Sequence, residues 1–270
     1  MSQVFLFEPH ADDFLLSQGI AAAHYLGAGF KVNLVTMSAE GSGGVLDDLA
    51  GDVVCGSHGY RHSPAKEGYA APLEADFHNL RLAESRAALG TLAAAITGSG
   101  GVEHFDGGLP VSFGGPPGAP PTPAGIAAAK DVIKYYVDTY ANGTTFFHTM
   151  SPTDNHPDHA ACGKALRELK QDPAYSSKLS GSRFFVSRLY WNDADVIAEG
   201  TTTFPVTPSR KPEYDKAVRI AAKAYAAWQP PQTLAVGYHQ VINQFYKNGL
   251  DSQGNWTPSN TIAIENRWHD

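Results

Sequence analysis

The first 37 residues contain a strand, a helix and a second strand, and this order constrains the fold more than any other feature. Val4–Phe7 is an apolar run too short for a helix, and Phe30–Met37 is rich in β-branched and apolar residues. Between them, apolar and small residues recur at helical spacing: Leu16, Ile20, Ala23 and Gly27. Strands joined by a helical crossover run parallel, so we expect an α/β protein with a parallel sheet.

The same alternation of strands and helices continues along the chain. We expect further strands at 102–105, 144–150 and 183–191, and helices at 76–95, 124–140 and 213–228. In the helix at 76–95, four residues take its polar positions: Arg81, Glu84, Ser85 and Arg86. We therefore expect a single domain over residues 1–270.

Three segments depart from this pattern. Residues 38–75 are glycine-rich and carry histidines without helical or strand periodicity, and residues 107–123 are rich in proline and glycine. We expect both to be long surface loops, and loops of this length are commonly lids or binding loops. We expect residues 230–270 to form an irregular tail. Most of its aromatic residues are expected to pack in the core or at its rim, as aromatic side chains generally do: Tyr238, Phe245, Tyr246, Trp256 and Trp268.

Charge and composition limit the partners. The formal net charge is −7 and the pI is near 5.8, which argues against nucleic acid or an anionic membrane as a partner. No apolar run has the length of a transmembrane helix, and the N-terminus has no basic region typical of a signal peptide. Two cysteines do not form a disulfide framework, so we expect a cytoplasmic protein.

A first polar cluster follows the first strand immediately. His10, Asp12 and Asp13 lie where that strand ends and the next helix begins. In open α/β sheets ligands bind at the carboxyl ends of the strands. One aspartate here has an ordinary explanation as a helix cap, but a cap does not need an imidazole and two carboxylates. Such a cluster suits a divalent metal with a base beside it.

A second polar cluster, His156-Pro157-Asp158-His159, follows the strand at 144–150. Histidines near a helix N-terminus are often only hydrogen-bonded surface groups. Because both clusters follow strands of one predicted parallel sheet, however, they can open onto one crevice. His10, Asp13 and His159 can then supply three zinc ligands. Asp12 is left as a base, His156 as an electrophilic partner and Asp158 as a carboxylate that orients an imidazole.

The two motifs resemble the signatures of the PIG-L/LmbE-like N-deacetylases. Pro9–Asp13 is similar to the first signature and His156–His159 to the second, and the likeness covers most of residues 3–170. The resemblance implies a Rossmann-like α/β fold with helices on both faces of a mostly parallel sheet. It also implies a Zn2+ ion held by His10, Asp13 and His159, with Asp12 as general base and His156 stabilising the tetrahedral intermediate. The family removes an acyl group from the nitrogen of an amino sugar.

Within that family the chain is most similar to deacetylases of glycopeptide-antibiotic pseudoaglycones of the teicoplanin type. This implies a glycosylated small-molecule or peptide substrate carrying an N-acyl glucosaminyl group. Phe14 stands where an acidic residue is common in the family, and the loops at 38–75 and 107–123 are long. These departures bear on the substrate more than on the chemistry, and the two loops are the suspected substrate-binding elements.

Several alternatives remain open at the level of sequence. A protein of this fold that binds glycans or metal without turnover needs the ligands but not Asp12, and another N-acetylglucosamine conjugate is an alternative substrate. A metal-dependent phosphoesterase more often needs two metals and a basic clamp, which the sequence does not show. Cys162 suits a small buried residue better than a ligand. Cys55, His58 and His62 invite a second metal site, but their spacing is not a recognisable zinc pattern.

Overall fold

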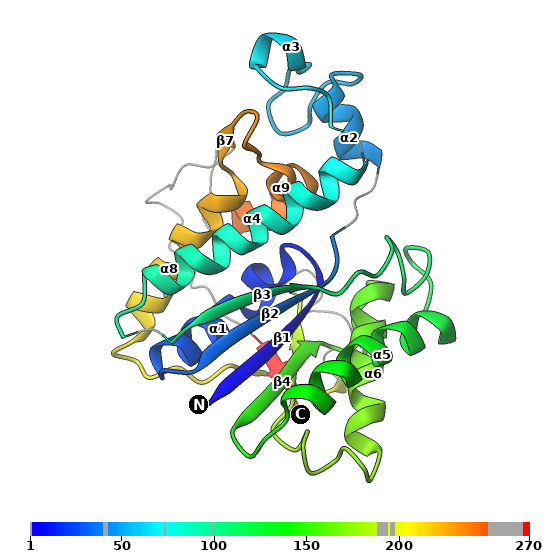
Figure 1. Ribbon diagram of the computed structural model, residues 1–270, viewed down its shortest axis with the longest axis vertical. Helices are drawn as coiled ribbons and strands as arrows, with labels where there is room; N and C mark the ends of the chain where they lie inside the picture. Colours follow the sequence, from blue (N-terminus) through cyan, green and yellow to red (C-terminus); the bar gives the residue numbers. More distant parts are fainter. Residues whose placement is uncertain are drawn as a thin grey trace.

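The computed structural model describes residues 2–39, 43–72, 74–98, 100–187, 194, 198–247 and 267–270. Within these residues a sheet of seven strands has the order β3-β2-β1-β4-β5-β9-β6 (Figure 1). Its strands are β1 (Gln3–His10), β2 (Lys31–Ser38), β3 (Val102–Asp106), β4 (Thr145–Met150), β5 (Arg183–Val186), β6 (Thr202–Thr203) and β9 (Arg267–His269). The pairs among β1 to β5 are parallel, and β9 pairs antiparallel with both β5 and β6. The predicted α/β class is confirmed.

Side chains alternate across the sheet and build two cores. On β1, Val4 and Leu6 face one core, whereas Phe5 and Phe7 face the other, as the two-residue period of a strand requires. The first core is packed by helices α1 (Gly19–Gly27), α4 (Glu74–Ala94), α8 (Lys211–Tyr225) and α9 (Val236–Lys247). The second is packed by α5 (Pro123–Tyr140) and α6 (Pro157–Gln171), on the opposite face (Figure 1). This is the Rossmann-like arrangement expected.

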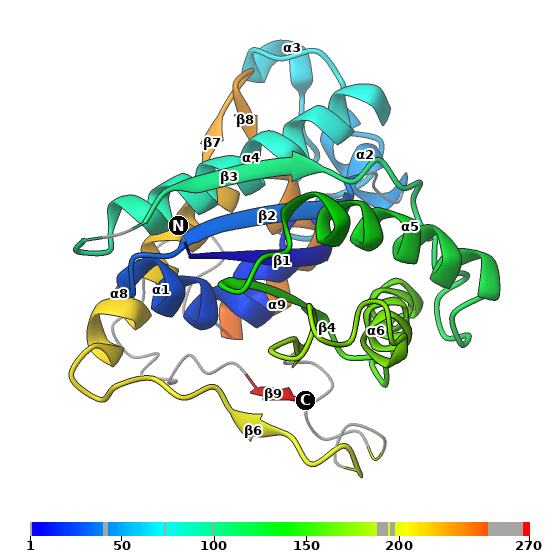
Figure 2. The same ribbon diagram turned by 60° about the horizontal axis from the view of Figure 1, so that its bottom comes forward.

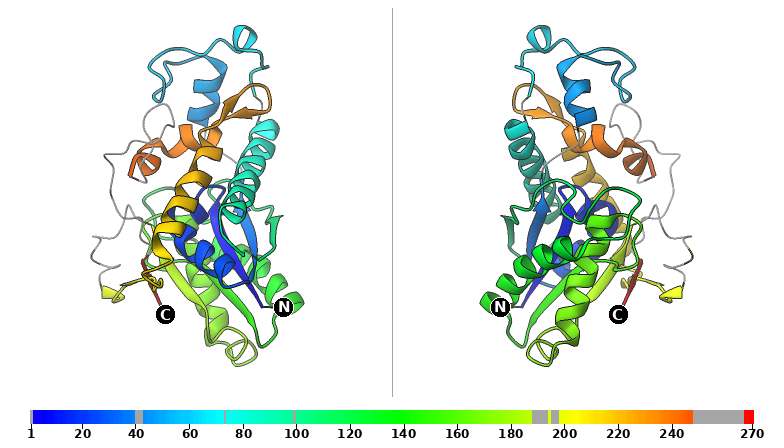
Figure 3. Two further views of the ribbon diagram at one scale, coloured as in Figure 1. Left: turned by 90° about the vertical axis from the view of Figure 1, so that its left-hand side faces the viewer. Right: turned by 90° about the vertical axis from the view of Figure 1, so that its right-hand side faces the viewer.

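The segment between β2 and α4 is more ordered than the sequence suggested. Within the expected loop 38–75, the structure has α2 (Gly43–Ala50) and α3 (Pro64–Glu67). Buried Val45, Leu49 and Tyr69 pack against Phe77 of α4 and Val236 of α9. The description of this segment as a loop was therefore wrong for α2 and α3, which lie at the end of the molecule opposite both termini (Figure 3).

The tail is also more regular than expected. It contains helix α9, after the small hairpin of β7 (Trp228–Gln229) and β8 (Thr233–Leu234), and ends in strand β9 beside β6 (Figure 2). Tyr238 and Phe245 are buried in the first core, as expected for aromatic residues of the tail. Trp256 and the end of the strand expected at 183–191 lie outside the described residues. The description of residues 230–270 as irregular was wrong for 236–247.

All the site-bearing segments leave the sheet at one edge. The first four parallel strands, β1 to β4, end at His10, Ser38, Asp106 and Met150, and the register pairs His10 with Ser38. The polar clusters follow β1 and β4, and the segments 39–72 and 107–123 follow β2 and β3. Because carboxyl ends of parallel strands share an edge, the fold brings two clusters and two long segments to the same side.

Candidate active site

The turn after β1 presents the first cluster. His10 is the last residue of β1, and Asp12 and Asp13 lie in the tight turn that leads into η1 (Phe14–Gln18), a short π-helical segment. Asp12 and Asp13 are buried, and His10 is partly buried. Single π-helical turns are rare and occur frequently at functional sites.

The second cluster comes from the junction of β4 and α6. The chain turns through residues 151–155, and α6 begins at Pro157 with His156 as its N-cap. His159, in the first turn of α6, is buried. The structure thus brings together the two motifs that lie about 150 residues apart in the sequence.

Three ligand-type atoms converge between the two clusters. Asp13 Oδ2 lies 3.1 Å from His10 Nδ1 and 3.1 Å from His159 Nε2, and these two nitrogens are 3.4 Å apart. A tetrahedral zinc ion with bonds of about 2.1 Å separates neighbouring ligand atoms by about 3.4 Å. The spacing of this triangle therefore fits one zinc ion with three protein ligands.

Carboxylates on the outer side of each ring fix which nitrogens face inward. His10 Nε2 lies 2.9 Å from Asp158 Oδ2, and His159 Nδ1 lies 3.2 Å from Asp154 Oδ2. An N–H that donates to each carboxylate leaves His10 Nδ1 and His159 Nε2 with a lone pair in the neutral ring. Two lone pairs and a carboxylate oxygen facing one another fit a cation, and carboxylate partners behind ligand histidines are typical of zinc sites.

The protonation equilibria reflect the same contacts. Burial alone would raise the pKa of Asp13, but the charge and hydrogen bonds of His159 and His10 hold it well below its usual range. Burial opposes protonation of His10, yet its hydrogen bonds to Asp13 and Asp158 raise its pKa to about 8. The carboxylates of the cluster therefore stabilise positive charge on the neighbouring imidazoles.

Asp12 has a different environment from its neighbour. Its Oδ2 lies 3.3 Å from an Nη2 of Arg81, a buried residue of α4, and no ring of the triangle takes it as a hydrogen-bond partner among the described contacts. Burial raises the pKa of Asp12 above its ordinary value, although the Arg81 guanidinium opposes the shift. Asp12 is therefore the carboxylate of the pair whose proton affinity is enhanced.

His156 lies against both ligand-type histidines. Its ring centroid is 4.8 Å from those of His10 and His159. Its Nδ1 accepts the backbone N–H of Asp158 at 3.3 Å, the capping bond of α6. Burial lowers the pKa of His156 to about 4, so the ring is neutral at pH 7 and carries its proton on Nε2. His156 therefore offers an N–H donor.

Two residues of the site were not assigned from the sequence. Asp154 accepts from the backbone N–H of His156 at 2.9 Å in addition to its contact with His159. Gly114, in the 107–123 loop, donates its N–H to Asp158 Oδ1 at 2.5 Å. Asp154 lies two residues before the second cluster and its carboxylate was the available signal, whereas nothing in the sequence marks Gly114.

The remaining sequence candidates fall into three places. Cys162 is fully buried, as a small core residue is, and burial raises its pKa well above the ordinary value. Cys55, His58 and His62 lie together with a fourth residue, His239 of α9, which the sequence did not suggest. In helix α4, Arg81, Glu84 and Ser85 occupy polar positions that are buried between elements.

The sequence motifs and this geometry agree with the family comparison. The family model of PIG-L, described as GlcNAc-PI de-N-acetylase, matches residues 5–170, more than half of the chain. The chain belongs to the PIG-L family of de-N-acetylases. Both motifs of the PIG-L chain lie within the matched region, as do Arg81 and the loop that carries Gly114. No curated protein matches the chain in sequence.

Solved structures share the fold over the full length of this PIG-L protein. The zinc-inhibited form of teicoplanin deacetylase Orf2 superposes with a TM-score of 0.52 at 17% identity. A deacetylase–bog complex from the biosynthesis pathway of teicoplanin gives 0.53 at 16%, and a deacetylase–teicoplanin complex gives 0.52 at 15%. In each case 99% of this chain and 97% of the other are covered. Among the described residues, no helix is both long and apolar enough to cross a membrane.

Proposed function

We propose that this protein is a zinc-dependent hydrolase that removes an N-acyl group, acetyl in the simplest case, from a glucosaminyl moiety. The observation that carries the proposal is the triangle of His10 Nδ1, Asp13 Oδ2 and His159 Nε2, with edges of 3.1, 3.1 and 3.4 Å. Three protein ligands leave a coordination position open, as catalytic zinc sites do. Zinc held by these residues would supply a Lewis acid that polarises an amide carbonyl and lowers the pKa of the attacking water toward neutral pH.

The other residues then take distinct roles in amide hydrolysis. Asp12 takes the proton of the attacking water and delivers it to the departing nitrogen, and burial raises the pKa of Asp12 above its ordinary value. Arg81 holds the Asp12 carboxylate in place. His156 donates a hydrogen bond from its Nε2–H to the oxyanion that develops on the carbonyl oxygen. Asp158 and Asp154 orient the rings of His10 and His159.

The substrate we propose is an acylated glucosaminyl group on a bulky scaffold, such as a glycopeptide pseudoaglycone. Two long segments leave the same sheet edge as the site, and both present exposed apolar side chains: Val53, Val54 and Tyr60 in one, Val111 in the other. Apolar and aromatic surface suits a large, partly apolar partner. The structurally similar proteins described as acting in teicoplanin biosynthesis, one of them bound to teicoplanin, support this choice.

Mass spectrometry of acylated amino-sugar conjugates after incubation with the zinc-loaded protein tests the reaction. We expect each N-acyl glucosaminyl conjugate to lose the acyl mass and gain a free amine. Folded, zinc-loaded protein that leaves every conjugate intact would favour the non-catalytic binding protein instead.

The scaffold preference is tested separately, by comparing kcat/KM for free N-acetylglucosamine with that for the same sugar on a glycopeptide scaffold. Contacts remote from the reacting amide raise kcat/KM when their binding energy is used in the transition state. We expect free sugar to be poorer by at least about 100-fold, the equivalent of two or three well-packed apolar contacts. Equal values would show that the two long segments do not select the scaffold.

A further inference from the structure

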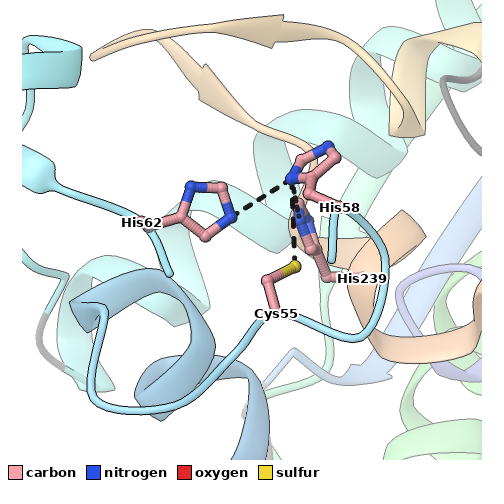
Figure 4. A group of neighbouring side chains, drawn as sticks. All are labelled: Cys55, His58, His62 and His239. Carbon is pink, nitrogen blue, oxygen red and sulfur yellow. Dashed lines mark hydrogen bonds between the residues drawn. The ribbon is translucent and has the colours of Figure 1, made fainter. Parts of the chain in front are cut away.

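A second group of ligand-type side chains lies away from the three-residue triangle. Cys55, His58 and His62 come from the segment between α2 and α3, and His239 comes from α9. One ligand atom from each lies within 4.8 Å of the other three. Figure 4 shows the other three side chains directed at the ring of His58. Two segments 181 residues apart in the sequence, measured from His58 to His239, thus meet at one point.

The three distances from His58 Nδ1 match those between the ligand atoms of a tetrahedral zinc ion. His58 Nδ1 lies 3.2 Å from His62 Nε2, 3.4 Å from His239 Nε2 and 3.8 Å from Cys55 Sγ. Zinc bonds of about 2.05 Å to nitrogen and about 2.3 Å to sulfur separate nitrogen pairs by about 3.3 Å, and nitrogen from sulfur by about 3.6 Å. Each observed separation is within about 0.2 Å of these values.

The outer nitrogens of two rings are already engaged. His62 Nδ1 lies 2.9 Å from Glu67 Oε2, and His239 Nδ1 lies 2.7 Å from the carbonyl oxygen of Ala235. Donation to these acceptors leaves His62 Nε2 and His239 Nε2 with lone pairs directed at His58. Carboxylate and carbonyl partners behind ligand histidines are the outer contacts that metal sites use.

Burial makes this arrangement costly without a cation. Cys55 is fully buried, and His62 and His239 are 4% and 7% exposed. A single N–H on His58 Nδ1 cannot fully satisfy two nitrogen acceptors at once, and an acceptor left without a partner in the interior costs about 1–3 kcal/mol. A metal ion at the centre satisfies all four atoms together.

We infer that Cys55, His58, His62 and His239 form a structural zinc site that fastens the segment 51–63 to helix α9. Four protein ligands, three imidazoles and one thiolate, complete a tetrahedron and leave no open position, which is the pattern of structural rather than catalytic zinc. The soft thiolate disfavours Mg2+ and Ca2+, which prefer oxygen ligands. The inference does not depend on the proposed reaction, because none of these four residues belongs to the triangle.

The site has a structural consequence for the segment that carries it. Residues 51–63 connect α2 to α3 and expose Val53, Val54 and Tyr60. The ring of His62 also stacks on Trp228 of the β7–β8 hairpin, with centroids 4.9 Å apart. A bound ion therefore adds a direct link between this surface segment and helix α9.

Cobalt substitution tests the site directly, because a thiolate bound to Co2+ gives a charge-transfer band in the near ultraviolet. The full-length protein is stripped of metal and loaded with Co2+, and its spectrum is compared with those of three variants. We expect the band in the wild type, in Cys162→Ala, which removes the other thiol, and in His10→Ala/His159→Ala, which disables the triangle. Cys55→Ser should lose it.

Zinc content provides the second measurement, so that a poorly folded Cys55→Ser variant does not decide the matter. We expect about two zinc ions per wild-type chain, one for each site, and about one in His239→Ala and in His10→Ala/His159→Ala. Limited proteolysis should cut within 51–63 at least about tenfold faster in zinc-loaded His239→Ala than in zinc-loaded His10→Ala, because only the former loses the tether.

Three results would overturn the inference. These are a cobalt-loaded wild type without the thiolate band, a band that Cys162→Ala abolishes, or wild type and His239→Ala with equal zinc content. A wild-type protein without acyl hydrolase activity would contradict the proposed function but not this inference. Neither the thiolate band nor the zinc bound at this site depends on turnover.

Discussion

At the scale of single residues, the adjacent carboxylates of Asp12 and Asp13 have opposite surroundings. Asp13 touches both ring nitrogens that face inward, whereas Asp12 pairs with Arg81. Burial raises the pKa of both carboxyl groups, but their neighbours differ. At Asp13 the histidines outweigh burial and the pKa falls, whereas at Asp12 burial outweighs Arg81 and the pKa rises. This division is what a ligand and a base require.

Substitution of Asp12 by asparagine tests the division. Asn keeps the shape of the side chain but cannot accept a proton, so we expect zinc to remain bound and kcat to fall about 100-fold or more. Metal content and steady-state rates of the variant measure both effects. Near-normal kcat would contradict the role of Asp12 as base, and loss of zinc would place Asp12 among the ligands.

His156 has two roles that one substitution can separate. As the N-cap of α6 it accepts a backbone N–H, and as a neutral ring it offers Nε2–H to the oxyanion. Asn is a good N-cap, so His156→Asn should keep stability that His156→Ala loses, typically about 1 kcal/mol. Both variants should lose kcat by about 10²-fold or more while retaining zinc. Wild-type kcat in His156→Asn would contradict the oxyanion role and leave His156 only its role as the N-cap of α6.

Residue identity predicted much of the triangle but little of what supports it. The spacing His-x-Asp-Asp and His-x-x-His gave all three converging atoms, because each motif follows a strand end. Gly114 could not be predicted from the sequence, since it contributes a backbone N–H, which every residue except proline has. His239 was equally hidden, because its pairing with Cys55, His58 and His62 depends on how α9 packs, and no short spacing encodes that.

At the scale of elements, the 107–123 loop is anchored at the first turn of α6, beside the candidate active site. A Cβ added to Gly114 would lie 2.4 Å from the carbonyl oxygen of Pro157 and 2.7 Å from the nitrogen of Asp158. The loop therefore contacts the first turn of α6 through a residue with no side chain. Any larger residue must push the loop away from Asp158.

The variant Gly114→Ala should show this effect in activity. Displacement of the loop breaks the bond to Asp158 and shifts the ring of His10, and misplacement of about 1 Å can cost about 100-fold in rate. We expect kcat/KM to fall at least about tenfold with zinc retained. Gly143→Ala, where an added Cβ meets nothing within 4 Å, is the matched control. Equal activity in the two variants would exclude an anchoring role for Gly114.

Strand β4 contains a buried histidine that makes stability depend on pH. His148 accepts the backbone N–H of Arg183 at Nδ1, so its neutral ring donates Nε2–H to Tyr25 Oη at 2.7 Å. Burial lowers the pKa of His148 to about 3 from an ordinary 6.5. The unfolded chain therefore binds the proton more readily, and the stabilisation present above pH 6.5 is lost as the pH falls toward 3.

Replacement of His148 by asparagine keeps an acceptor near Nδ1 and removes the titration. Wild type should lose more unfolding free energy between pH 7 and pH 5 than His148→Asn does, as measured by urea denaturation at each pH. Parallel losses in the two proteins would mean that His148 is not a source of the acid sensitivity.

Elements were easier to predict than their surroundings. Long helices and buried strands could be predicted, because the spacing of apolar residues in the sequence indicates both kinds of element. In contrast, α2 was missed although Val45, Leu46 and Leu49 have helical spacing, since glycines and histidines surround so short a run. Helix α9 was missed because its apolar residues pack in three dimensions against α4 and α8.

At the scale of the whole molecule, one edge of the sheet gathers the groups that act directly in the proposed reaction. The triangle, the base and the oxyanion donor come from the ends of β1 and β4, and the long segments come from the ends of β2 and β3. Two separate cores hold these strands in register. Position on a parallel sheet, rather than nearness in sequence, therefore assembles the site.

The central claim is that acyl hydrolysis depends on zinc held by His10, Asp13 and His159. The most direct measurement follows deacylation of an N-acyl glucosaminyl conjugate by mass spectrometry while zinc is added back to metal-stripped protein. We expect the rate to be negligible without zinc, to rise with occupancy of the triangle, and to stay at least about 1,000-fold lower in folded His10→Ala/His159→Ala at every zinc concentration. A double variant that deacylates at the wild-type rate would contradict the claim.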